Sequence, residues 1–508
     1  MKLETIIGLE FHVELKTTSK MFCRCSNETN PKNPNENVCP ICMGHPGTLP
    51  IVNREAINKA IAIALALNCE INLRNKFDRK NYFYPDLPKG YQISQYDLPI
   101  AEHGWFLINK TEGLTGSLTD EEKMKRVGII RVHMEEDTAK LTHAAINEAG
   151  AKRSISAADF NRAGVPLVEI VTEPSFSTPF EAKTFAQELQ QLLRYLNASD
   201  ADMEKGHLRC DANISLRPEG DNNFYTKVEI KNLNSFRAIE KALTAEESRL
   251  TILWHDNKYP QTKETRGWDD KKQETILQRT KEDVADYRFF PEPDIPPLQL
   301  NNEEITAIKN ERPELPQEKR LRFVDEYGIS FDKAALLIAE KNLSDYFEQS
   351  MSELIEWIDS ADNENDKAKD KIAKTWMLWF IDFYLPKLTT EKVVNKDFII
   401  SAENFAEFIK LRLAGKMNTQ VAKKVFEIML MNGQDPSQIL EENDFRTADA
   451  NELDHIVKQV IKNNPREVVA YKQGKVALLQ FFVGQAMKET NGQADPNEMK
   501  SLFENFLK

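Results

Sequence analysis

Three side chains that can bind a metal ion or move a proton stand at alternate positions near the start of the chain. The segment Gly8–Leu15 reads GLEFHVEL, so apolar residues alternate with Glu10, His12 and Glu14. This period of two predicts a strand with one apolar and one polar face, on which successive polar residues lie about 7 Å apart. Two carboxylates and an imidazole in such a row could bind Mg²⁺ beside a phosphate-bearing substrate. The alternative is an amphipathic strand whose polar face is solvated.

Four of the six cysteines form two close pairs. One residue separates Cys23 from Cys25, two separate Cys39 from Cys42, and thirteen separate the pairs. Two such pairs joined by a loop are the usual arrangement of a tetrahedral site with four sulfur ligands. The spacing predicts a structural zinc ion that ties the loop to the preceding strand. The alternative is a loop with four free thiols, which would be prone to oxidation.

Further carboxylates occur where strands are predicted. Residues 135–137 read EED and follow a predicted strand over Val127–His133. Consecutive acids repel one another unless a cation or a proton relieves them, and at least one should turn to the polar face. Glu169 lies inside the apolar strand predicted over Leu167–Val171, where a carboxylate is costly unless it is paired or binds a metal. A solvated acidic turn is the alternative for residues 135–137.

Two later segments repeat the alternation of polar and apolar residues. Arg209 and Asp211 belong to one predicted strand, and Glu229 and Lys231 to another. A sheet face with charged residues on three strands is a binding or catalytic site if these residues converge. The segment 77–97 combines aromatic residues with Lys and Gln, which suits stacking against a nucleotide base. The alternative for this segment is an ordinary packed loop.

Composition limits the class of protein. A chain of 508 residues predicts roughly three domains. The net charge of −13 argues against nucleic-acid binding over the whole surface, although Lys and Arg are in excess after residue 408 and could contact phosphates. The alternative is that these basic residues form solvated helix faces. No signal peptide and no run of eighteen apolar residues occurs, so we expect a cytoplasmic protein without membrane contact.

The pattern changes from strand-like to helical near residue 298. We therefore predict an α+β fold that begins with a cradle over residues 1–298, formed by a mixed or antiparallel β-sheet, flanking helices and a zinc knuckle. An all-α helical domain should follow over residues 299–407. A small all-α tail domain should occupy residues 408–508.

Nine motifs occur in one order between residues 4 and 298. They are GLEFHVEL, the four-cysteine spacing, RKNYFYPD, PKGYQISQYD, HMEED, NRAGVPLVEIVTEP, LRCDANISLRP, EIKNLNSF and DYRFFPEPDIPPL. Each motif alone is weak, but nine in this order are specific. On these motifs the chain resembles the B subunit of the tRNA-dependent amidotransferases.

This resemblance implies an ATP-dependent carbon–nitrogen ligase. Its substrate would be Glu-tRNA(Gln), Asp-tRNA(Asn) or both, whose side-chain carboxylate is phosphorylated and then amidated. Ammonia would come from a separate glutaminase A subunit, with a small C subunit completing a heterotrimer. ATP and Mg²⁺ would be needed besides the structural zinc, and the tail would contact the body of the tRNA. The chain has no Walker sequence and no kinase-type glycine-rich loop, so its nucleotide site belongs to neither common class.

The resemblance also implies roles for individual residues. The Mg²⁺ ligands would be Glu10, His12 and Glu136. The catalytic residues would be Glu136, Glu135, His12 and Lys89. Phosphate oxygens of the nucleotide would meet Lys80, Arg209 and Lys231. A weaker implication places Glu169, Asp211 and Glu229 in the same pocket or beside it.

Two other classes of function stay open at this point. The chain could be a non-catalytic adaptor that holds tRNA for a catalytic partner, but the clustered face expected from Glu10, His12 and Glu136 argues against that class. It could also be a metal-dependent hydrolase of nucleic acid, because a site of carboxylates and histidine serves that reaction as well.

Overall fold

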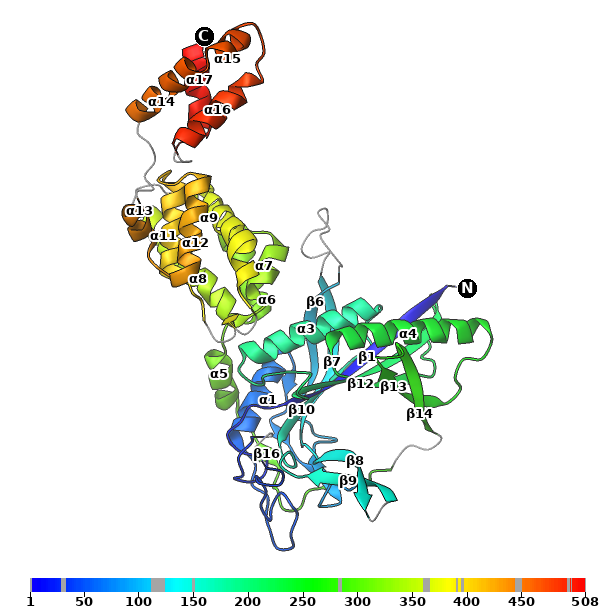
Figure 1. Cartoon of the computed structure of the whole chain (residues 1–508). Helices are drawn as coiled ribbons and strands as arrows, with labels where there is room; N and C mark the ends of the chain where they lie inside the picture. Colours follow the sequence, from blue (N-terminus) through cyan, green and yellow to red (C-terminus); the bar gives the residue numbers. More distant parts are fainter. Residues whose placement is uncertain are drawn as a thin grey trace. The chain divides into compact units, whose positions relative to one another are not determined.

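The computed structural model divides into two units, Met1–Pro316 and Gln317–Lys508 (Figure 1). It describes residues 2–28, 33–110, 124–148, 151–281, 286–359, 366–389, 392–393, 397–443, 450–490, 494 and 496–507. The first unit contains strands and helices, and the described part of the second contains helices without strands. The predicted α+β class is therefore confirmed, whereas the domain limits at residues 298 and 407 stay predictions.

The first unit is built around a sheet of 12 strands. Its strands are β1 (Leu3–Glu14), β2 (Glu70–Ile71), β4 (Asp78–Asn81), β5 (Tyr91–Ser94), β6 (Ala101–Asn109), β7 (Met124–Glu136), β10 (Pro166–Thr172), β11 (Leu208–Pro218), β12 (Val228–Leu233), β13 (Lys263–Asp269), β14 (Glu274–Lys281) and β15 (Phe290–Pro291). The main order is β14-β13-β12-β11-β1-β10-β7-β5-β4-β15, and β6 joins β7 to β2. The pair β12–β13 is parallel and the others are antiparallel, so the sheet is mixed.

Two small sheets accompany the large one. In the first, β3 (Arg74–Asn75) pairs with β16 (Leu298–Gln299). In the second, β8 (Lys140–Glu148) pairs with β9 (Ala151–Asp159) as a hairpin.

Strand β1 lies at the centre of the large sheet, between β10 and β11. Leu9, Phe11 and Val13 are buried, while the residues between them are partly exposed, as the alternation of the sequence predicts. Phe11 packs on Phe185, with 5.7 Å between ring centroids. The apolar face of β1 therefore anchors the core, and its other face is free to carry the polar side chains.

Helices cover the apolar face of this sheet. They are α1 (Arg54–Ala66), α3 (Pro179–Tyr195) and α4 (Phe236–His255), and α5 (Asn302–Glu311) follows at the end of the unit. In Figure 1, α3 and α4 run side by side along the sheet. Their starts are set by Thr178 and Ser235, whose hydroxyls accept hydrogen bonds from backbone N–H groups of the first turn.

The second unit is built from helices around two apolar clusters. Its elements are α6 (Pro316–Tyr327), α7 (Phe331–Ile338), α8 (Lys341–Asp359), α9 (Asp366–Trp379), the π-helix η1 (Phe380–Tyr384), the 3₁₀-helix η2 (Leu385–Lys387), α11 (Ala402–Leu413), α12 (Thr419–Asn432), α13 (Pro436–Glu442), α14 (Ala450–Asn463), α15 (Pro465–Lys472), α16 (Leu478–Glu489) and α17 (Pro496–Leu507). One cluster lies within residues 323–439 and the other within residues 453–507. No helix in the described part of the chain is long and apolar enough to cross a membrane.

Replacing Phe11 by alanine should strongly destabilise the first unit. The side chain is fully buried, and removing such an aromatic ring costs about 3–5 kcal/mol because a cavity remains. The free energy of unfolding can be measured by urea denaturation of the full chain, followed by hydrogen exchange of strand amides. Phe83→Ala is the matched control because Phe83 is 91% exposed. Equal losses in the two variants would contradict the central role of β1.

Candidate active site

The register of four neighbouring strands lines up charged side chains across the polar face of the sheet. On β1, His12 stands opposite Glu169 of β10 on one side and opposite Arg209 of β11 on the other. Glu169 in turn stands opposite His133 of β7. Cross-strand neighbours on one face are close enough to interact directly, so these four residues form a continuous row.

Three residues of this face can hold a metal ion together. His12, Glu135 and Glu169 each offer a ligand atom, and the three atoms lie within 4.8 Å of one another. The Nε2 atom of His12 is 3.7 Å from Glu135 Oε1 and 3.6 Å from Glu169 Oε2. Two buried carboxylates and an imidazole fit a divalent cation that keeps open positions for a substrate.

The carboxylate of Glu169 is held in its charged form. Burial by itself would raise its pKa, but His133, His12 and Lys80 act more strongly in the other direction. The pKa of Glu169 therefore lies well below its usual range. The closest of these contacts joins His133 Nε2 and Glu169 Oε2 at 2.9 Å. A charged carboxylate at this position is the form that binds a cation.

Several polar nitrogen atoms on this face, among them the guanidinium donors of two arginines, have no hydrogen-bond partner among the described residues. The Nε atoms of Arg131 and Arg209 and the Nδ1 atom of His133 are buried without a hydrogen bond. The ammonium of Lys80 lies 5.2 Å from the centroid of the Tyr287 ring, and no ion pair or hydrogen bond to it is seen in the described parts of the chain. Buried donors without partners are costly, which favours an anionic ligand that completes them.

Arg209 is also tied to the acidic end of β7. Its Nη2 atom donates a hydrogen bond to Asp137. Burial would lower the pKa of Arg209, but the attraction of Asp137, with Glu135 and Glu14 further away, outweighs burial and raises it. Arg209 is therefore a permanent cation beside the His12 group.

The remaining sequence-predicted residues of this face form a second network, next to the His12 group. Asn213 Nδ2 donates to Glu10 Oε1 at 3.0 Å. Lys231 Nζ lies 2.6 Å from Asp211 Oδ2 and 3.3 Å from Glu229 Oε1. Burial lowers the pKa of Lys231, but the two carboxylates outweigh it and the net shift is upward. Lys231 is therefore paired with two carboxylates, and Glu10 accepts a hydrogen bond from the side-chain amide of Asn213.

Glu136 lies elsewhere, because consecutive residues of a strand face opposite sides. Its carboxylate forms an ion pair with Lys89 and accepts a hydrogen bond from the backbone N–H of Ile93 at 2.9 Å. Both charged side chains are buried, at one wall of a cavity of about 200 Å³ that also meets Cys42. Within the described residues, Glu136 and Glu10 are not part of the group around His12. Their roles as metal ligands stay predictions.

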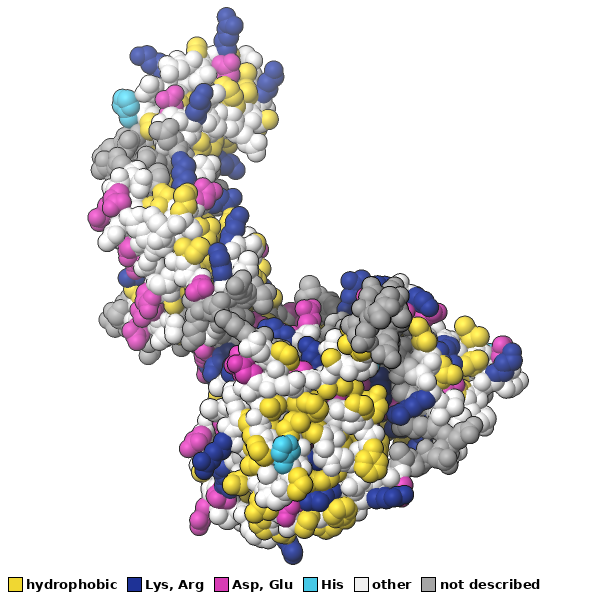
Figure 2. Space-filling view, turned by 60° about the horizontal axis from the view of Figure 1, so that its bottom comes forward, with side chains coloured by type: hydrophobic (Ala, Val, Ile, Leu, Met, Phe, Trp, Pro, Cys, Tyr) yellow, Lys and Arg dark blue, Asp and Glu magenta, His cyan; other side chains and the backbone are white. Residues whose placement is uncertain are grey.

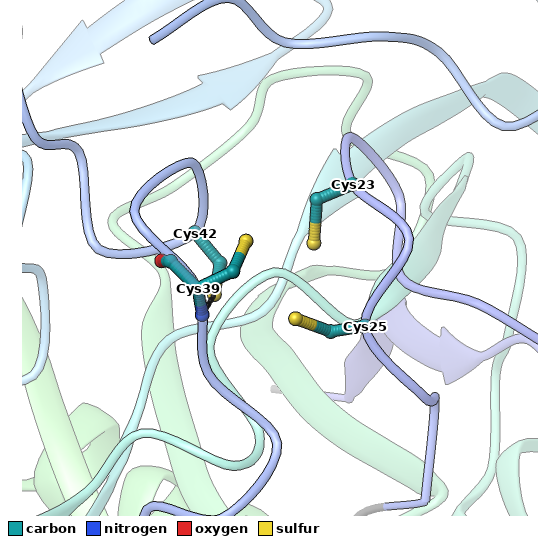
Figure 3. Close-up of side chains that lie close together, drawn as sticks. All are labelled: Cys23, Cys25, Cys39 and Cys42. Atoms are coloured by element: carbon teal, nitrogen blue, oxygen red, sulfur yellow. Dashed lines mark hydrogen bonds between the residues drawn. The ribbon is translucent and has the colours of Figure 1, made fainter.

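The four clustered cysteines come together from two loops. Figure 3 shows Cys23 and Cys25 on one loop and Cys39 and Cys42 on another, with their sulfur atoms turned toward a common space. The four sulfur atoms lie within 4.8 Å of one another, so they can bind one metal ion. A hydrogen bond with Cys23, assisted by the backbone N–H of Cys39, lowers the pKa of Cys42 to about 5 against the effect of burial.

Lys20 is buried next to this cysteine cluster. Its Nζ atom donates to the carbonyl oxygen of Asn37 at 2.7 Å and to that of Phe160 at 3.3 Å, and it lies 4.0 Å from Cys42 Sγ. A buried cation offsets part of the negative charge that several thiolates bring to one place. The residues present therefore fit a site for a metal with sulfur ligands.

Comparisons with known proteins give matches over nearly the whole chain. The family model described as GatB/GatE catalytic domain matches residues 5–306, and the GatB domain matches residues 362–507. The B subunit of the aspartyl/glutamyl-tRNA(Asn/Gln) amidotransferase of Crocosphaera subtropica is 44% identical over 506 residues, which cover 99% of this chain and 97% of that protein. The corresponding B subunit of Brevibacillus brevis is 42% identical over 508 residues, which cover 100% of this chain and 99% of that protein.

The chain belongs to the family of amidotransferase B subunits. This finding confirms the family predicted from the nine sequence motifs. The catalytic-domain match includes every polar strand of the sheet and both cysteine loops. The charged face of the sheet therefore lies within residues 5–306, the part of the chain that matches the catalytic domain of the family.

Several residues of this B-subunit site were missed in the sequence. His133 and Arg131 precede Glu135 at intervals of two, so the alternation that identified Glu10 and His12 could have placed them on the polar face. Asp137, the partner of Arg209, was seen only as one of three neighbouring acids. Nothing in the sequence around Lys20 predicted that it is buried, because its burial depends on loops that are distant in the sequence.

Replacing Lys89 by methionine should destabilise the first unit of this B subunit. The carboxylate of Glu136 would stay buried without its cation, which costs about 3–5 kcal/mol. Urea denaturation of the full chain measures the loss, and the double variant Lys89→Met/Glu136→Gln should recover much of it. Lys16→Met is the matched control, since Lys16 pairs with Asp200 at the exposed surface. A loss in Lys89→Met no greater than in Lys16→Met would show that the buried pair is dispensable.

Proposed function

We propose that this chain activates the side-chain carboxylate of Glu-tRNA(Gln), Asp-tRNA(Asn) or both with ATP, within an amidotransferase complex. The observation that carries the proposal is the group His12, Glu135 and Glu169 beside buried donors that lack partners among the described residues. The relatives are named as B subunits of aspartyl/glutamyl-tRNA(Asn/Gln) amidotransferases, which supports the substrate class. A non-catalytic adaptor would have no need for such a costly group.

The reaction proceeds in two balanced steps. An oxygen of the aminoacyl carboxylate attacks the γ-phosphorus of ATP, and ADP leaves with the electrons of the broken P–O bond. The lone pair of ammonia then attacks the carbonyl carbon of the acyl phosphate, the C–O bond to phosphate breaks, and the proton lost from nitrogen leaves on inorganic phosphate as the amide forms. Phosphorylation is needed because a carboxylate oxygen is otherwise too poor a leaving group. Neutral ammonia is the nucleophile, since ammonium has no free lone pair.

The polar face supplies the groups that the first step requires. His12, Glu135 and Glu169 would hold Mg²⁺, which neutralises charge that develops on the transferring phosphoryl group. The unpartnered nitrogens of Arg131 and Arg209 would donate to phosphate or carboxylate oxygens. Together these residues hold two anions, the phosphates and the carboxylate, close to one another despite their repulsion.

A structural zinc ion in the cysteine cluster is part of the proposal. Two loops supply two sulfur atoms each, and a site with four sulfur ligands leaves no open position for catalysis. The ion would tie both loops to the sheet. Gly44 lies against the buried pair of Lys89 and Glu136: a Cβ atom there would stand 2.2 Å from Lys89 Cγ, so the knuckle packs directly on this ion pair.

The proposed complex contains a glutaminase A subunit and a small C subunit. Hydrophobic side chains gather on one face of the first unit (Figure 2). Large exposed apolar residues in this unit include Leu49, Ile51, Phe83, Tyr84, Tyr96 and Phe290. Exposed apolar side chains of this kind support a protein-binding surface on the first unit.

The tail would contact the body of the tRNA. Its exposed basic residues include Lys458, Lys462, Arg466, Lys472 and Lys475. Such residues suit phosphate contacts that position a nucleic acid without reading its sequence.

ADP release by the purified complex should depend on charged tRNA. With Mg²⁺ present and no amide donor, Glu-tRNA(Gln) should stimulate ADP release, and uncharged tRNA should not. Glu135→Gln should reduce the stimulated rate by about 100-fold or more, because the cation would lose a ligand. Glu136→Gln in the same assay tests the role implied by the sequence resemblance.

Glu70→Gln is the control for this assay, since Glu70 is exposed outside the site. ADP release that is indifferent to charging, or unchanged in Glu135→Gln, would mean that the chain only presents the tRNA. Cleavage of the tRNA during incubation with Mg²⁺ would favour a nuclease instead.

The purified chain should contain zinc that depends on the cysteine cluster. Cys42→Ser should lose most of the metal and lower the thermal stability of the first unit, because structural zinc contributes directly to folding. Cys69→Ser is the matched control: Cys69 is buried outside the cluster, so its replacement should leave the zinc content unchanged. Metal analysis by mass spectrometry gives the result, and equal zinc content in both variants would exclude the cluster as its site.

A further inference from the structure

The hairpin of β8 and β9 connects two strands of the candidate active site but pairs with neither. The chain enters it after Asp137, at the end of β7, and leaves it at Asn161, a few residues before β10. Behind the hairpin, the N–H of Gly164 donates to the carbonyl oxygen of Asp137 at 2.9 Å, which closes the sheet. In the described parts of the chain, β8 and β9 pair only with each other (Figure 1). The hairpin is therefore an excursion from the large sheet.

The strands of this hairpin bury little of their own surface. Residues 142–145 of β8 and 154–157 of β9 are exposed. Burial begins near the base, where Leu141 and Ala158 are half-buried. A two-stranded hairpin is at best marginally stable in water, and exposed side chains add little to its stability. The contacts at its base must therefore hold it in place.

An asparagine of the cysteine loop holds the end of β9. Asn35, four residues before Cys39, accepts a hydrogen bond at Oδ1 from the N–H of Phe160 at 2.7 Å. Its Nδ2 donates to the carbonyl oxygen of Ala158 at 3.3 Å, and its backbone N–H donates to the Asp159 carboxylate at 3.0 Å. The φ of Asn35 is 59°, in the left-handed region that asparagine tolerates. One side-chain amide thus supplies the donor and the acceptor that a neighbouring strand would offer to β9.

A second asparagine makes the reciprocal connection. Asn161 accepts a hydrogen bond at Oδ1 from the N–H of Asn37 at 2.8 Å, and its Nδ2 donates to the carbonyl oxygen of Asn33 at 2.9 Å. Asn161 is buried, so these hydrogen bonds would be costly to leave unmade. We call Asn35 and Asn161 together the asparagine latch.

Lys20 joins the asparagine latch to the cysteine cluster. Its Nζ atom donates to the carbonyl oxygens of Asn37 and Phe160, one on each side of the latch, and lies 4.0 Å from Cys42 Sγ. Lys20 is fully buried, so its charge requires such partners. Cysteine thiolates that bind a metal ion would place negative charge at the same point. The latch and the metal site therefore share one buried cation.

Residues 33–37 depend on the cysteine cluster for their own position. They belong to the loop between Cys25 and Cys39, and a metal ion bound by both cysteines would close this loop at its two ends. Four thiols without a metal have no such bond between them, so the loop would regain conformational freedom. The asparagine latch would then lose one of its two sides.

We propose that a metal ion bound by the four cysteines holds the β8–β9 hairpin in place through the asparagine latch. This inference rests on the structural metal of the proposed function and gives that metal a second role. Loss of the metal would release the hairpin, while β10, which pairs on both edges, would stay in the sheet. The metal would thus control the element that connects the strands of Glu135 and Glu169 without contacting either side chain.

Hydrogen exchange of the zinc-loaded full chain tests the latch. Asn35→Gly should speed amide exchange in β8 and β9 by about tenfold or more, because it removes two hydrogen bonds and keeps the left-handed turn. Asn257→Gly is the matched control, since Asn257 is also left-handed and exposed but follows α4. The zinc content should be equal in the two variants. Equal exchange of the hairpin in both variants would overturn the proposal.

Removal of zinc with a chelator tests the coupling between the metal and the hairpin. In the unaltered chain, chelation should speed exchange in β8 and β9 by a similar factor and leave β10 protected. In Asn35→Gly, chelation should add little to the exchange of the hairpin, because the latch is already broken.

Three results of chelation would contradict the coupling. They are an unaffected hairpin, effects of chelation and Asn35→Gly that simply add, and a loss of protection in β10 together with the hairpin. A chain that never binds zinc would reject the metal site itself and this inference with it. Normal zinc binding with an unaffected hairpin would reject only the role of the latch.

Discussion

The site depends on the alternation of side chains along β1 at the centre of the sheet. Strand β1 pairs with a neighbour on each edge. Its register therefore sets which side chains of β10 and β11 share the face of His12, and β10 does the same for β7. The burial of Phe11 in the core and the position of His12 on the opposite face both follow from the same alternation of side chains along β1. A shift of register by one residue would exchange the two faces, so burial of the apolar row also holds the charged row in place.

The polar face is stable only as a set of charges. Glu135 and Glu169 are buried, and Glu169 stays charged because His133, His12 and Lys80 surround it. The same face retains buried donors that the described residues do not satisfy. An arrangement of this kind is not optimal for folding alone, and it becomes favourable when an anion and a cation complete it. The cost in stability therefore supports the proposal that this face binds charged ligands.

Strand β7 separates two different environments. Glu135 faces the His12 group, whereas Glu136 faces Lys89 and the cavity beside the cysteine cluster. The close packing at Gly44 links the cluster to Lys89, and Lys20 links it to the backbone at Phe160. The cysteine loops therefore support the sheet from the side opposite the charged row. Four sulfur ligands that leave no open position fit a structural role.

The sequence by itself determined the elements whose signal is local. Alternation identified the polar face of β1, spacing identified the four cysteines, and an acid inside an apolar run identified Glu169 as a residue that needs a partner. Alternation with Val132 and Met134 places Glu135 on the same face as His133, but only the pairing of β7 with β10 brings that face beside His12. The partners of Glu10 and Lys231, the burial of Lys20 and the asparagine latch were likewise decided only by the tertiary structure. Each of these depends on contacts between segments far apart in the chain, which local periodicity does not encode.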